Sequence, residues 1–373
     1  MGNYAREENL MRSLWKLSCA LLVLGLLVVG VSACGGGSDS SSTTAEAGTE
    51  TGGGSGAGGN IEIDVGTHTL EFPQGTEPKI ALFSASGTAY QEAAREGVEE
   101  AAKRYGYEVT DFDNKFDPTT QLSQMQTALS GGGYNAWISE SNAGKILCKT
   151  IQDAGEKNIA VVQVTNFTCD QEGKPAGEES WTPGTLASVS AQFTVSYYEG
   201  FAKKVSELAK PGAEVGVLNG PPTIPTTAML KTALEKAGLD PVEEANTNYT
   251  TPEGLAEAQN MLQAHPGISV IVSIYSDLTV GATRAIEAAG KEGQIELFDM
   301  GASKSSVKLI EEGKLTMSVP DYPRTGGEQT VEVLHEAFEG KPIERFYPAL
   351  GQGTATEPFF VTKENVNEFE PEY

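Results

Sequence analysis

The sequence has few of the residues from which metal and nucleic-acid sites are built. Its 373 residues include three His and four Cys, without any HxxxH, HxH or CxxC spacing. We therefore expect no metal site of imidazole or thiolate ligands and no cofactor. Basic residues are also scarce, since 26 Lys and Arg stand against 51 Asp and Glu for a formal net charge of −25. Such a surface repels phosphate backbones, so nucleic acid is not expected as a partner.

The motifs of common enzyme classes are missing as well. The chain has no GxSxG, no P-loop and no GxGxxG after a predicted strand. Acidic pairs such as Glu99-Glu100 are frequent in so acidic a chain, and we expect them on solvated helix faces. No enzyme is predicted, and no residue is assigned a catalytic role.

The N-terminal region contains an apolar run, Leu17–Val31, that is short for a bilayer-spanning helix, which takes about 20 residues. Arg12 and Lys16 precede the run and small residues follow it, which predicts a secretory signal peptide over residues 1–33. The stretch VSAC, which ends in Cys34, resembles the bacterial lipobox, whose Cys is lipidated and becomes the mature N-terminus. An ordinary signal peptide and an uncleaved anchor are the alternatives.

Residues 34–59 contain no large apolar side chain after the Cys and are rich in Gly, Ser and Thr. Such a segment cannot bury apolar surface, so we expect a disordered tether. The order of lipid, tether and folded part predicts an exported protein that is lipid-anchored at the cell envelope. It would lie in the periplasm or on the outer face of the cytoplasmic membrane.

Short apolar runs alternate with helical patterns along the rest of the chain. Residues 60–75 alternate apolar and polar side chains and predict a small hairpin. One series of strands and helices follows between residues 79 and 165, and a second between residues 213 and 298. Strands that alternate with single helices form parallel sheets, so we expect an α/β protein with two similar domains. A helix at Thr325–Phe338 and a short strand within Pro358–Asn367 would be absorbed by these two domains.

Asp299 follows a short apolar run and precedes a Gly and a helical pattern. Ligands bind outside the carboxyl ends of strands in open parallel sheets, so Asp299 is a candidate ligand contact. The alternative is a loop Asp that caps the following helix.

Two Cys are expected near one edge of the first sheet, Cys148 in the second turn of a helix and Cys169 just after a strand. A disulfide between them is sterically reasonable in an exported protein, and two separate buried thiols are the alternative. The polar residues 167–187 predict a long loop that either covers a cleft or is a solvated excursion anchored by Trp181. Tyr198, at helical spacing with other aromatic residues, is expected in the core unless it lines a cleft.

Five segments occur in an informative order and spacing. They are the strand and polar loop at Lys79–Tyr90, GVEEAAKRYGYEV at Gly97–Val109, DPTTQLSQMQTAL at Asp117–Leu129, SDLTVGATRAIEAAGK at Ser276–Lys291 and FDMGASKSSVKLIEEGKL at Phe298–Leu315. Together they resemble the type I periplasmic binding proteins, especially the ribose- and galactose-type sugar binders of ABC importers. The resemblance covers about residues 78–366.

The resemblance implies two lobes, each a parallel sheet flanked by helices, with a ligand clamped between them. Three crossovers would join the lobes, near Ser188–Gln192, Val319–Asp321 and Arg345–Pro348. The N-terminal lobe would comprise residues 60–190 and 321–346, and the C-terminal lobe residues 191–320 and 347–373.

The resemblance also implies which positions would contact the ligand. These are Ser86, Thr88, Tyr90 and Gln91 after the first strand, Asn166 after the fourth strand, Tyr249, Tyr275, Asp277 and Asp299 in the second lobe, and Asp321 at a crossover.

Two positions depart from the family pattern. Thr165-Asn166 stand where sugar binders carry an Asp-Arg pair, and Gly220–Thr227 lacks the Arg that usually follows the first strand of the second lobe. Arg side chains hold vicinal hydroxyls or carboxylates through paired hydrogen bonds. The carboxylates and aromatic rings that remain suit a neutral polyhydroxylated ligand or a cationic one, and an anionic ligand is disfavoured.

The function implied is that of a monomeric, lipid-anchored receptor that closes around a small polar solute, a sugar or polyol, and presents it to an ABC permease. One alternative is a receptor that reports its ligand to a membrane sensor or chemotaxis protein. Another, from a different class, is an envelope enzyme that acts on glycans.

Overall fold

A computed structural model describes residues 59–169, 171, 173–190, 194–222 and 224–373. The predicted signal peptide, Cys34 and the tether up to residue 58 lie outside the described residues. The described residues belong to one compact unit, and none of their helices has the length and apolar character needed to cross a membrane.

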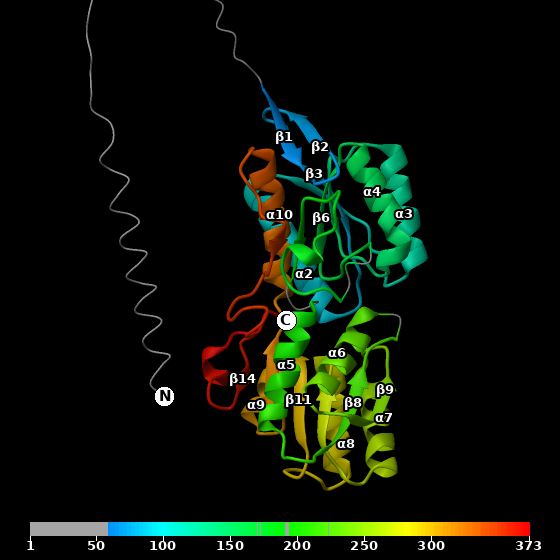
Figure 1. Cartoon of the computed structure of the whole chain (residues 1–373), viewed down its shortest axis with the longest axis vertical. Coiled ribbons are helices and arrows are strands. Elements are labelled where there is room, and N and C mark those ends of the chain that lie inside the picture. The colour runs from blue at the N-terminus through cyan, green and yellow to red at the C-terminus, as the bar shows by residue number, and fades with distance from the viewer. Residues whose placement is uncertain (1–58, 170, 172, 191–193, 223) are drawn as a thin grey trace, which may run out of the picture. The chain divides into compact units, whose positions relative to one another are not determined.

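The first sheet has six parallel strands in the order β13-β7-β6-β5-β3-β4. The strands are β3 Lys79–Phe83, β4 Glu108–Asp111, β5 Ala136–Ser139, β6 Ala160–Val164, β7 Ala187–Val189 and β13 Phe346–Tyr347. The helices around it are α2 Ala89–Tyr105, α3 Pro118–Gly131, α4 Gly144–Glu156 and α10 Pro323–Phe338, with a 3-10 turn at Glu178–Ser180. We call this sheet with its helices the first lobe (Figure 1).

Strand β3 explains why the first sheet reads as apolar runs. Ile80 and Leu82 pack into the core beneath α2 and α10, whereas Ala81 and Phe83 pack into the core beneath α3 and α4. Successive side chains of a strand point to opposite faces, and helices cover both faces here. A continuous apolar run therefore predicted β3 correctly.

The second sheet has the order β14-β12-β11-β10-β8-β9, in which only β14 pairs antiparallel to its neighbour among the described strands. The strands are β8 Glu214–Asn219, β9 Pro241–Asn246, β10 Ile268–Ser273, β11 Glu296–Gly301, β12 Met317–Pro320 and β14 Val361–Thr362. The helices are α5 Val195–Leu208, α6 Pro225–Lys236, α7 Thr251–Ala264, α8 Ser276–Ala288 and α9 Lys304–Glu311, and Val366–Glu368 is a 3-10 turn. We call these elements the second lobe.

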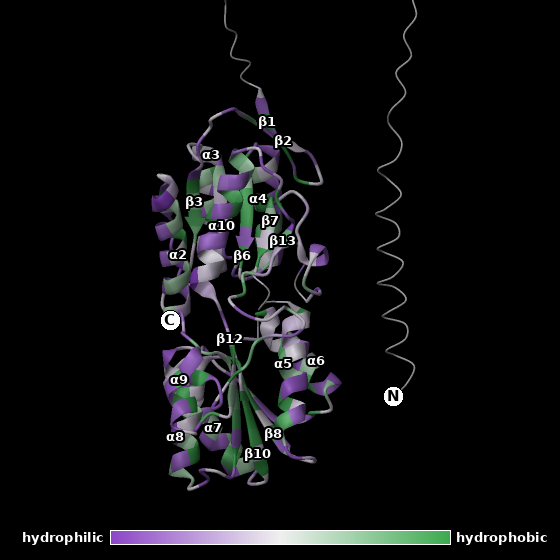
Figure 2. Ribbon diagram, turned by 90° about the vertical axis from the view of Figure 1, so that its left-hand side faces the viewer, coloured by the Kyte–Doolittle hydropathy of each residue, from purple (hydrophilic) through white to green (hydrophobic). Residues whose placement is uncertain are grey.

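The predicted α/β fold of two parallel-sheet lobes is confirmed. Figure 2 shows the hydrophobic central strands of the second sheet between helices that carry both hydrophilic and hydrophobic residues. The sequence pattern did not predict β9, because the side chains of this edge strand are half-buried or exposed and form no apolar run. The predicted hairpin is present as β1 Asn60–Asp64 and β2 Thr69–Pro73, which pair antiparallel.

The chain passes between the lobes after β7, after β12 and after β13. The expected boundary between residues 346 and 347 falls inside β13, because Tyr347 pairs with Val189 of the first sheet. The chain reaches the second sheet only at β14, which pairs with β12.

The segment at residues 372 and 373 contacts both lobes, which the sequence did not indicate. The Glu372 carboxylate accepts hydrogen bonds from the backbone N–H groups of Arg324, at 2.7 Å, and Thr325, at 3.2 Å, at the N-terminus of α10. The backbone oxygen of Tyr373 accepts a hydrogen bond from the Lys304 N–H, at the start of α9, at 2.8 Å. Its ring meets the ring of Tyr90 edge-on, with centroids 5.8 Å apart, so this segment supports a residue of the site described below.

The predicted disulfide joins Cys148 of α4 to Cys169 across a Cα–Cα distance of 4.9 Å, rather than leaving two separate thiols. The loop at 167–187 is anchored by Trp181, whose ring lies 4.4 Å from the guanidinium carbon of Arg345 and whose Nε1 donates to the Thr185 carbonyl. The loop therefore packs against the first lobe through its Trp.

Helices α2 and α10 approach each other through two glycines. A Cβ atom at Gly97 would lie 2.2 Å from the Arg324 carbonyl oxygen, and one at Gly327 would lie 2.1 Å from the Ala94 carbonyl oxygen. Such contacts are far inside van der Waals distance, so only Gly allows these backbones to come so close. This packing attaches α10 to the first lobe, although the preceding strand belongs to the second.

We predict that Gly327→Ala lowers the free energy of unfolding by about 1–3 kcal/mol, because the added methyl group forces the two helices apart. The neighbouring Gly326→Ala is the matched control, since its Cβ would meet no atom closer than 3.7 Å. That control should be neutral or stabilising by up to about 1 kcal/mol, the difference in helix propensity. Urea unfolding of both variants measures the effect, and equal midpoints would contradict the packing.

Candidate functional site

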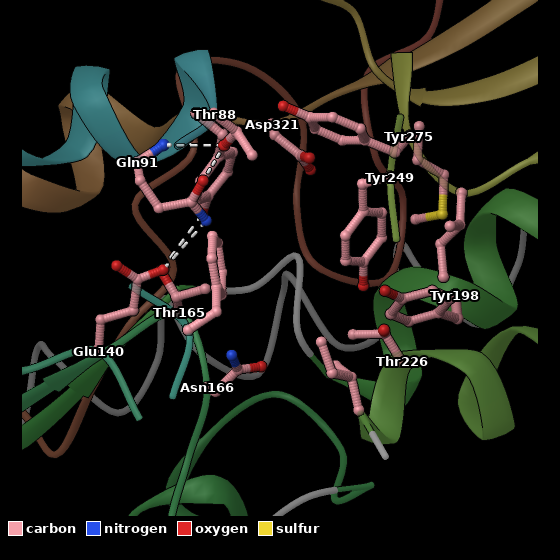
Figure 3. Close-up of a pocket in the computed structure, with 15 residues that line it drawn as sticks. Thr88, Gln91, Glu140, Thr165, Asn166, Tyr198, Thr226, Tyr249, Tyr275 and Asp321 are labelled. Atoms are coloured by element: carbon pink, nitrogen blue, oxygen red, sulfur yellow. Dashed lines mark hydrogen bonds between the residues drawn. The ribbon is translucent and has the colours of Figure 1, made fainter. Parts of the chain in front are cut away.

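A pocket lies between the two lobes at the carboxyl ends of their strands (Figure 3). The space that the centres of water molecules can reach inside it is about 80 Å³. A single buried water needs roughly 10–15 Å³ by this measure, so the pocket has room for a small solute. Its described lining residues are Thr88, Tyr90, Gln91, Phe116, Glu140, Thr165, Asn166, Tyr198, Ile224, Thr226, Tyr249, Ile274, Tyr275, Met300 and Asp321.

Parallel pairing explains how residues so far apart in sequence meet. Thr88 and Glu140 follow β3 and β5 of the first lobe, and Tyr275 and Asp321 follow β10 and β12 of the second. The carboxyl ends of parallel strands lie at one edge of a sheet, and the two edges face each other across the pocket.

Most of the residues expected to contact a ligand line this pocket. They are Thr88, Tyr90, Gln91, Asn166, Tyr249, Tyr275 and Asp321. Tyr90 is held beside Thr165, with 3.3 Å between their hydroxyl oxygens. The Thr165-Asn166 segment thus lies at the pocket even though it lacks the Arg of the family pattern.

Three expected residues lie outside the described lining. The Ser86 hydroxyl donates to Asp113 Oδ2 at 2.7 Å, and Asp277 is exposed in the first turn of α8. Asp299 is fully buried, and its Oδ2 accepts a hydrogen bond from the Ser306 hydroxyl at 2.7 Å.

Both interpretations of Asp299 are corrected by the structure. It does not reach the pocket, and Ser303 rather than Asp299 caps α9. Strand β11 continues through this position to Gly301, so Asp299 points toward the helices and the next residue, Met300, faces the pocket. Side chains alternate between the two faces of a strand, so a shift of one residue along the strand moves a side chain from one face to the other.

Burial controls the ionisation of Asp299. Its enclosure raises the pKa to about 6, although the hydroxyls of Ser318, Ser306 and Thr279 lower the pKa in part. The carboxyl group in this place is a buried structural element beneath the pocket wall.

Two acidic side chains line the pocket itself. Burial raises the pKa of Glu140 to about 7, against the weaker effect of the Gln91 amide, whose Nε2 donates to Glu140 Oε1 at 3.4 Å. Asp321 is half-buried, and the surrounding protein, followed by the charges of Asp299 and Glu372, raises its pKa to about 8. None of the described lining residues is Lys, Arg or His.

The side of the pocket formed by the second lobe also carries aromatic rings. The rings of Tyr249 and Tyr275 meet edge-on with centroids 5.4 Å apart, and burial raises the pKa of each to about 12. The hydroxyl of Thr226 lies beside those of Tyr198 and Tyr249 (Figure 3) and slightly opposes the effect of burial on their pKa values. It nevertheless meets neither at hydrogen-bonding geometry, because Thr226 Oγ1 is buried without a partner in the described structure.

The sequence interpretation missed several lining residues, of which Glu140 and Tyr198 are the most polar. Glu140 directly follows β5, so the strand-end rule that selected Asp299 applied to it as well. Tyr198 was expected in the core unless it lined a cleft. It is 3% exposed and lines the pocket, so it belongs both to the core and to the pocket wall. Phe116 lies in a loop after β4 with a φ of 60°, for which the sequence has no clear signal.

Within the part of the chain that the structure describes, no cluster of His, Cys, Asp or Glu could hold a metal ion. The pocket therefore offers hydrogen bonds, ring faces and two carboxyl groups to an organic solute.

Residues 80–342, more than half of the chain, match the family described as periplasmic binding protein domain. The chain belongs to this family. The ribose import binding protein of Bacillus subtilis (strain 168) is 22% identical over 254 residues, which cover 67% of this chain and 78% of that protein. The fructose import binding protein of Bifidobacterium longum (strain NCC 2705) is 20% identical over 340 residues, which cover 89% and 91%.

Solved structures show the same fold. An ABC transporter solute binding protein from Bacillus halodurans C-125 with bound myo-inositol aligns with a TM-score of 0.68 at 19% identity, covering 80% of this chain and 100% of that chain. The assignment to the type I periplasmic binding proteins, made from five segments of sequence, is thereby confirmed. The relatives named here are binding proteins rather than enzymes.

We predict that the free energy of unfolding of the unliganded protein falls as pH rises from about 4 to about 8. The folded-state pKa values of Asp321, Glu140 and Asp299 lie above their ordinary values, so the folded state binds more protons in this range. The stabilisation is complete below pH 4 and is lost as pH passes the folded-state pKa values.

Asp321→Asn should reduce this loss by at least about 1.4 kcal/mol, the equivalent of one pKa unit. Asp240→Asn, at an exposed position, is the control and should leave the pH dependence unchanged. Urea unfolding at pH 5 and pH 8 measures both variants, and identical slopes for them would show that Asp321 does not titrate as described.

Proposed function

We propose that the protein is an extracytoplasmic solute-binding lipoprotein of an ABC importer, which holds a small polar solute between its lobes. The observation that carries the proposal is the pocket, whose lining comes from strand ends of both lobes. A solute that contacts both walls would favour the closed arrangement, because only that arrangement supplies all its contacts.

The connections between the lobes would act as the hinge. They lie between β7 and α5, between β12 and α10, and between β13 and β14, and Asp321 belongs to the second of them. A solute bound to Asp321 would therefore couple directly to the segment whose backbone angles change on closure. The closed lobes would present a surface to the permease, and the protein would act as a monomer.

A sugar or sugar-like polyol is the solute class that the relatives favour, since their names and titles give ribose, fructose and myo-inositol. Tyr90, Tyr249 and Tyr275 offer ring faces and edges to apolar sugar surfaces, and Gln91, Asn166 and Asp321 offer polar groups to hydroxyls. Binding without chemistry is proposed, because the relatives named above are binding proteins.

Attachment to the envelope through Cys34 is proposed from the sequence alone. The apolar run, the VSAC stretch and the Gly/Ser/Thr-rich segment support it.

A thermal-shift screen of the purified protein against sugars, polyols, nucleosides and amino acids tests the function. A solute at about 100 times its Kd should stabilise the protein by about 2.7 kcal/mol. Tyr275→Ala should remove the solute-induced shift, because Tyr275 forms part of the second-lobe wall.

Tyr105→Ala is the matched control. The Tyr105 ring stacks on His335 at 4.0 Å and does not line the pocket, so its variant should keep the shift relative to its own unliganded Tm. Failure of every solute in the panel to move the Tm would overturn the proposed function.

A further inference from the structure

The charged residue types of the described pocket lining are all acidic. Glu140 and Asp321 are the carboxyl groups of the described lining, and the described residues that act on their ionisation include no Lys, Arg or His. Six residues between 59 and 373 are not described, and none of them is basic in the sequence: Asp170, Glu172, Ala191, Gln192, Phe193 and Thr223. The folded part therefore supplies no basic side chain to the pocket.

Basic residues that are near the lining residues in sequence are directed elsewhere. The Arg324 guanidinium, three residues after Asp321, bonds to Glu100 at 2.9 Å and to Glu96 on α2. Lys115, next to Phe116, is exposed and acts on the Asp113 carboxylate. Neither side chain lines the pocket.

The surroundings of the two carboxyl groups make them costly to ionise. Asp111 of β4 acts on Glu140, and Asp299 of β11 and Glu372 of the C-terminal segment act on Asp321, all with negative charge. Ionised carboxylates enclosed without a cation are unfavourable, whereas a partner of opposite charge stabilises them. A neutral solute leaves this imbalance in place, and a cationic solute removes it.

The aromatic residues of the pocket lining are suited to a cation as well. Tyr198, Tyr249, Tyr275 and Phe116 all contribute to the lining. Ring faces attract an ammonium group within about 6 Å, and the attraction is stronger where water is excluded. The acidic groups and the rings thus favour the same charge.

The pocket also offers hydrogen bonds to hydroxyl groups. Thr88 and Asn166 are neutral polar residues of the described lining and lie in the same pocket as the carboxyl groups. An amine alone would meet the carboxylates and would leave these neutral polar groups without a solute partner.

We propose that the pocket selects a small solute that carries a protonated amine beside its hydroxyl groups, an aminated sugar or polyol, over the neutral sugar of the same shape. This inference rests on the solute-binding function proposed above and narrows its ligand to a chemical class.

Matched pairs of solutes test the selectivity in isothermal titration of the purified protein. Each pair consists of a hexosamine and its parent hexose, or of an amino-alditol and its parent alditol, and the N-acetylated hexosamine serves as a neutral derivative of similar substitution. In at least one pair the aminated member should bind at least about tenfold more tightly than the parent, and acetylation should abolish that gain.

Two variants test whether the selectivity for the amine depends on the carboxyl groups of Glu140 and Asp321. Glu140→Gln and Asp321→Asn keep the side-chain shape and remove the charge, so each should weaken binding of the aminated member by about tenfold or more, and should weaken it more than binding of the parent. Asp240→Asn, at an exposed position that is not part of the described lining, should change neither affinity.

A measurement on the unaltered protein does not depend on the folding of variants. An ammonium ion would drive the two carboxyl groups into their ionised form, so binding near pH 7 should release about one proton. Titration in two buffers with different ionisation enthalpies measures this number.

The outcomes separate this inference from the function on which it rests. Neutral parents that bind as tightly as their aminated partners, or binding without proton release, would overturn the selectivity and leave the solute-binding function standing. Failure of all members of all pairs and of the wider screen would overturn both.

Discussion

The direction of strand pairing is the constraint on which the site depends. Strands β3, β5 and β6 of the first lobe run parallel to one another, as do β8, β10, β11 and β12 of the second. Parallel strands need a crossover at one end, so all their carboxyl ends, with the loops that follow, gather at one edge. Two such edges facing each other form a pocket from residues as distant as Thr88 and Asp321.

Long-range packing completes the two lobes. Helix α10 follows a strand of the second lobe but packs on α2 of the first, where Gly97 and Gly327 let the backbones touch. Glu372 accepts hydrogen bonds from the backbone N–H groups of Arg324 and Thr325 at the N-terminus of α10. The first N–H groups of a helix have no acceptor within the helix, and this carboxylate supplies one. These contacts hold the connection that carries Asp321, so the acidic group of the pocket is placed by residues at both ends of that segment.

The chemistry of the pocket depends on the residues that stand where the family resemblance implied Arg. Asn166 and Thr226 are neutral, whereas Glu140 and Asp321 are acidic and enclosed. In the proposed function, charge balance is left to the solute, and the ionisation of the carboxyl groups would be coupled to what is bound. A pocket of this kind differs from one with Arg clamps in its response to pH, because Arg stays charged throughout the physiological range.

The sequence by itself determined the fold class, the hairpin and seven of the fifteen described lining residues. Apolar runs separated by single helical patterns require parallel sheets, and the family resemblance placed Thr88 and Tyr90 after the first strand, Asn166 after the fourth strand and Asp321 at a crossover. Such signals are local, since a strand, a helix or a strand end is marked by its own neighbours in the chain. The pairing of Cys148 with Cys169 could be suggested in the same way, because both follow from the predicted elements.

Only the tertiary structure decided which side chain at a strand end lines the pocket. Asp299 and Met300 are adjacent, yet the first is buried against Ser306 and the second lines the pocket. The sequence marks the end of β11 but not its last paired residue, and one residue reverses the face. Glu140 and Tyr198 enter the site for a similar reason: their direction depends on elements packed against them from elsewhere in the chain, which no local pattern records.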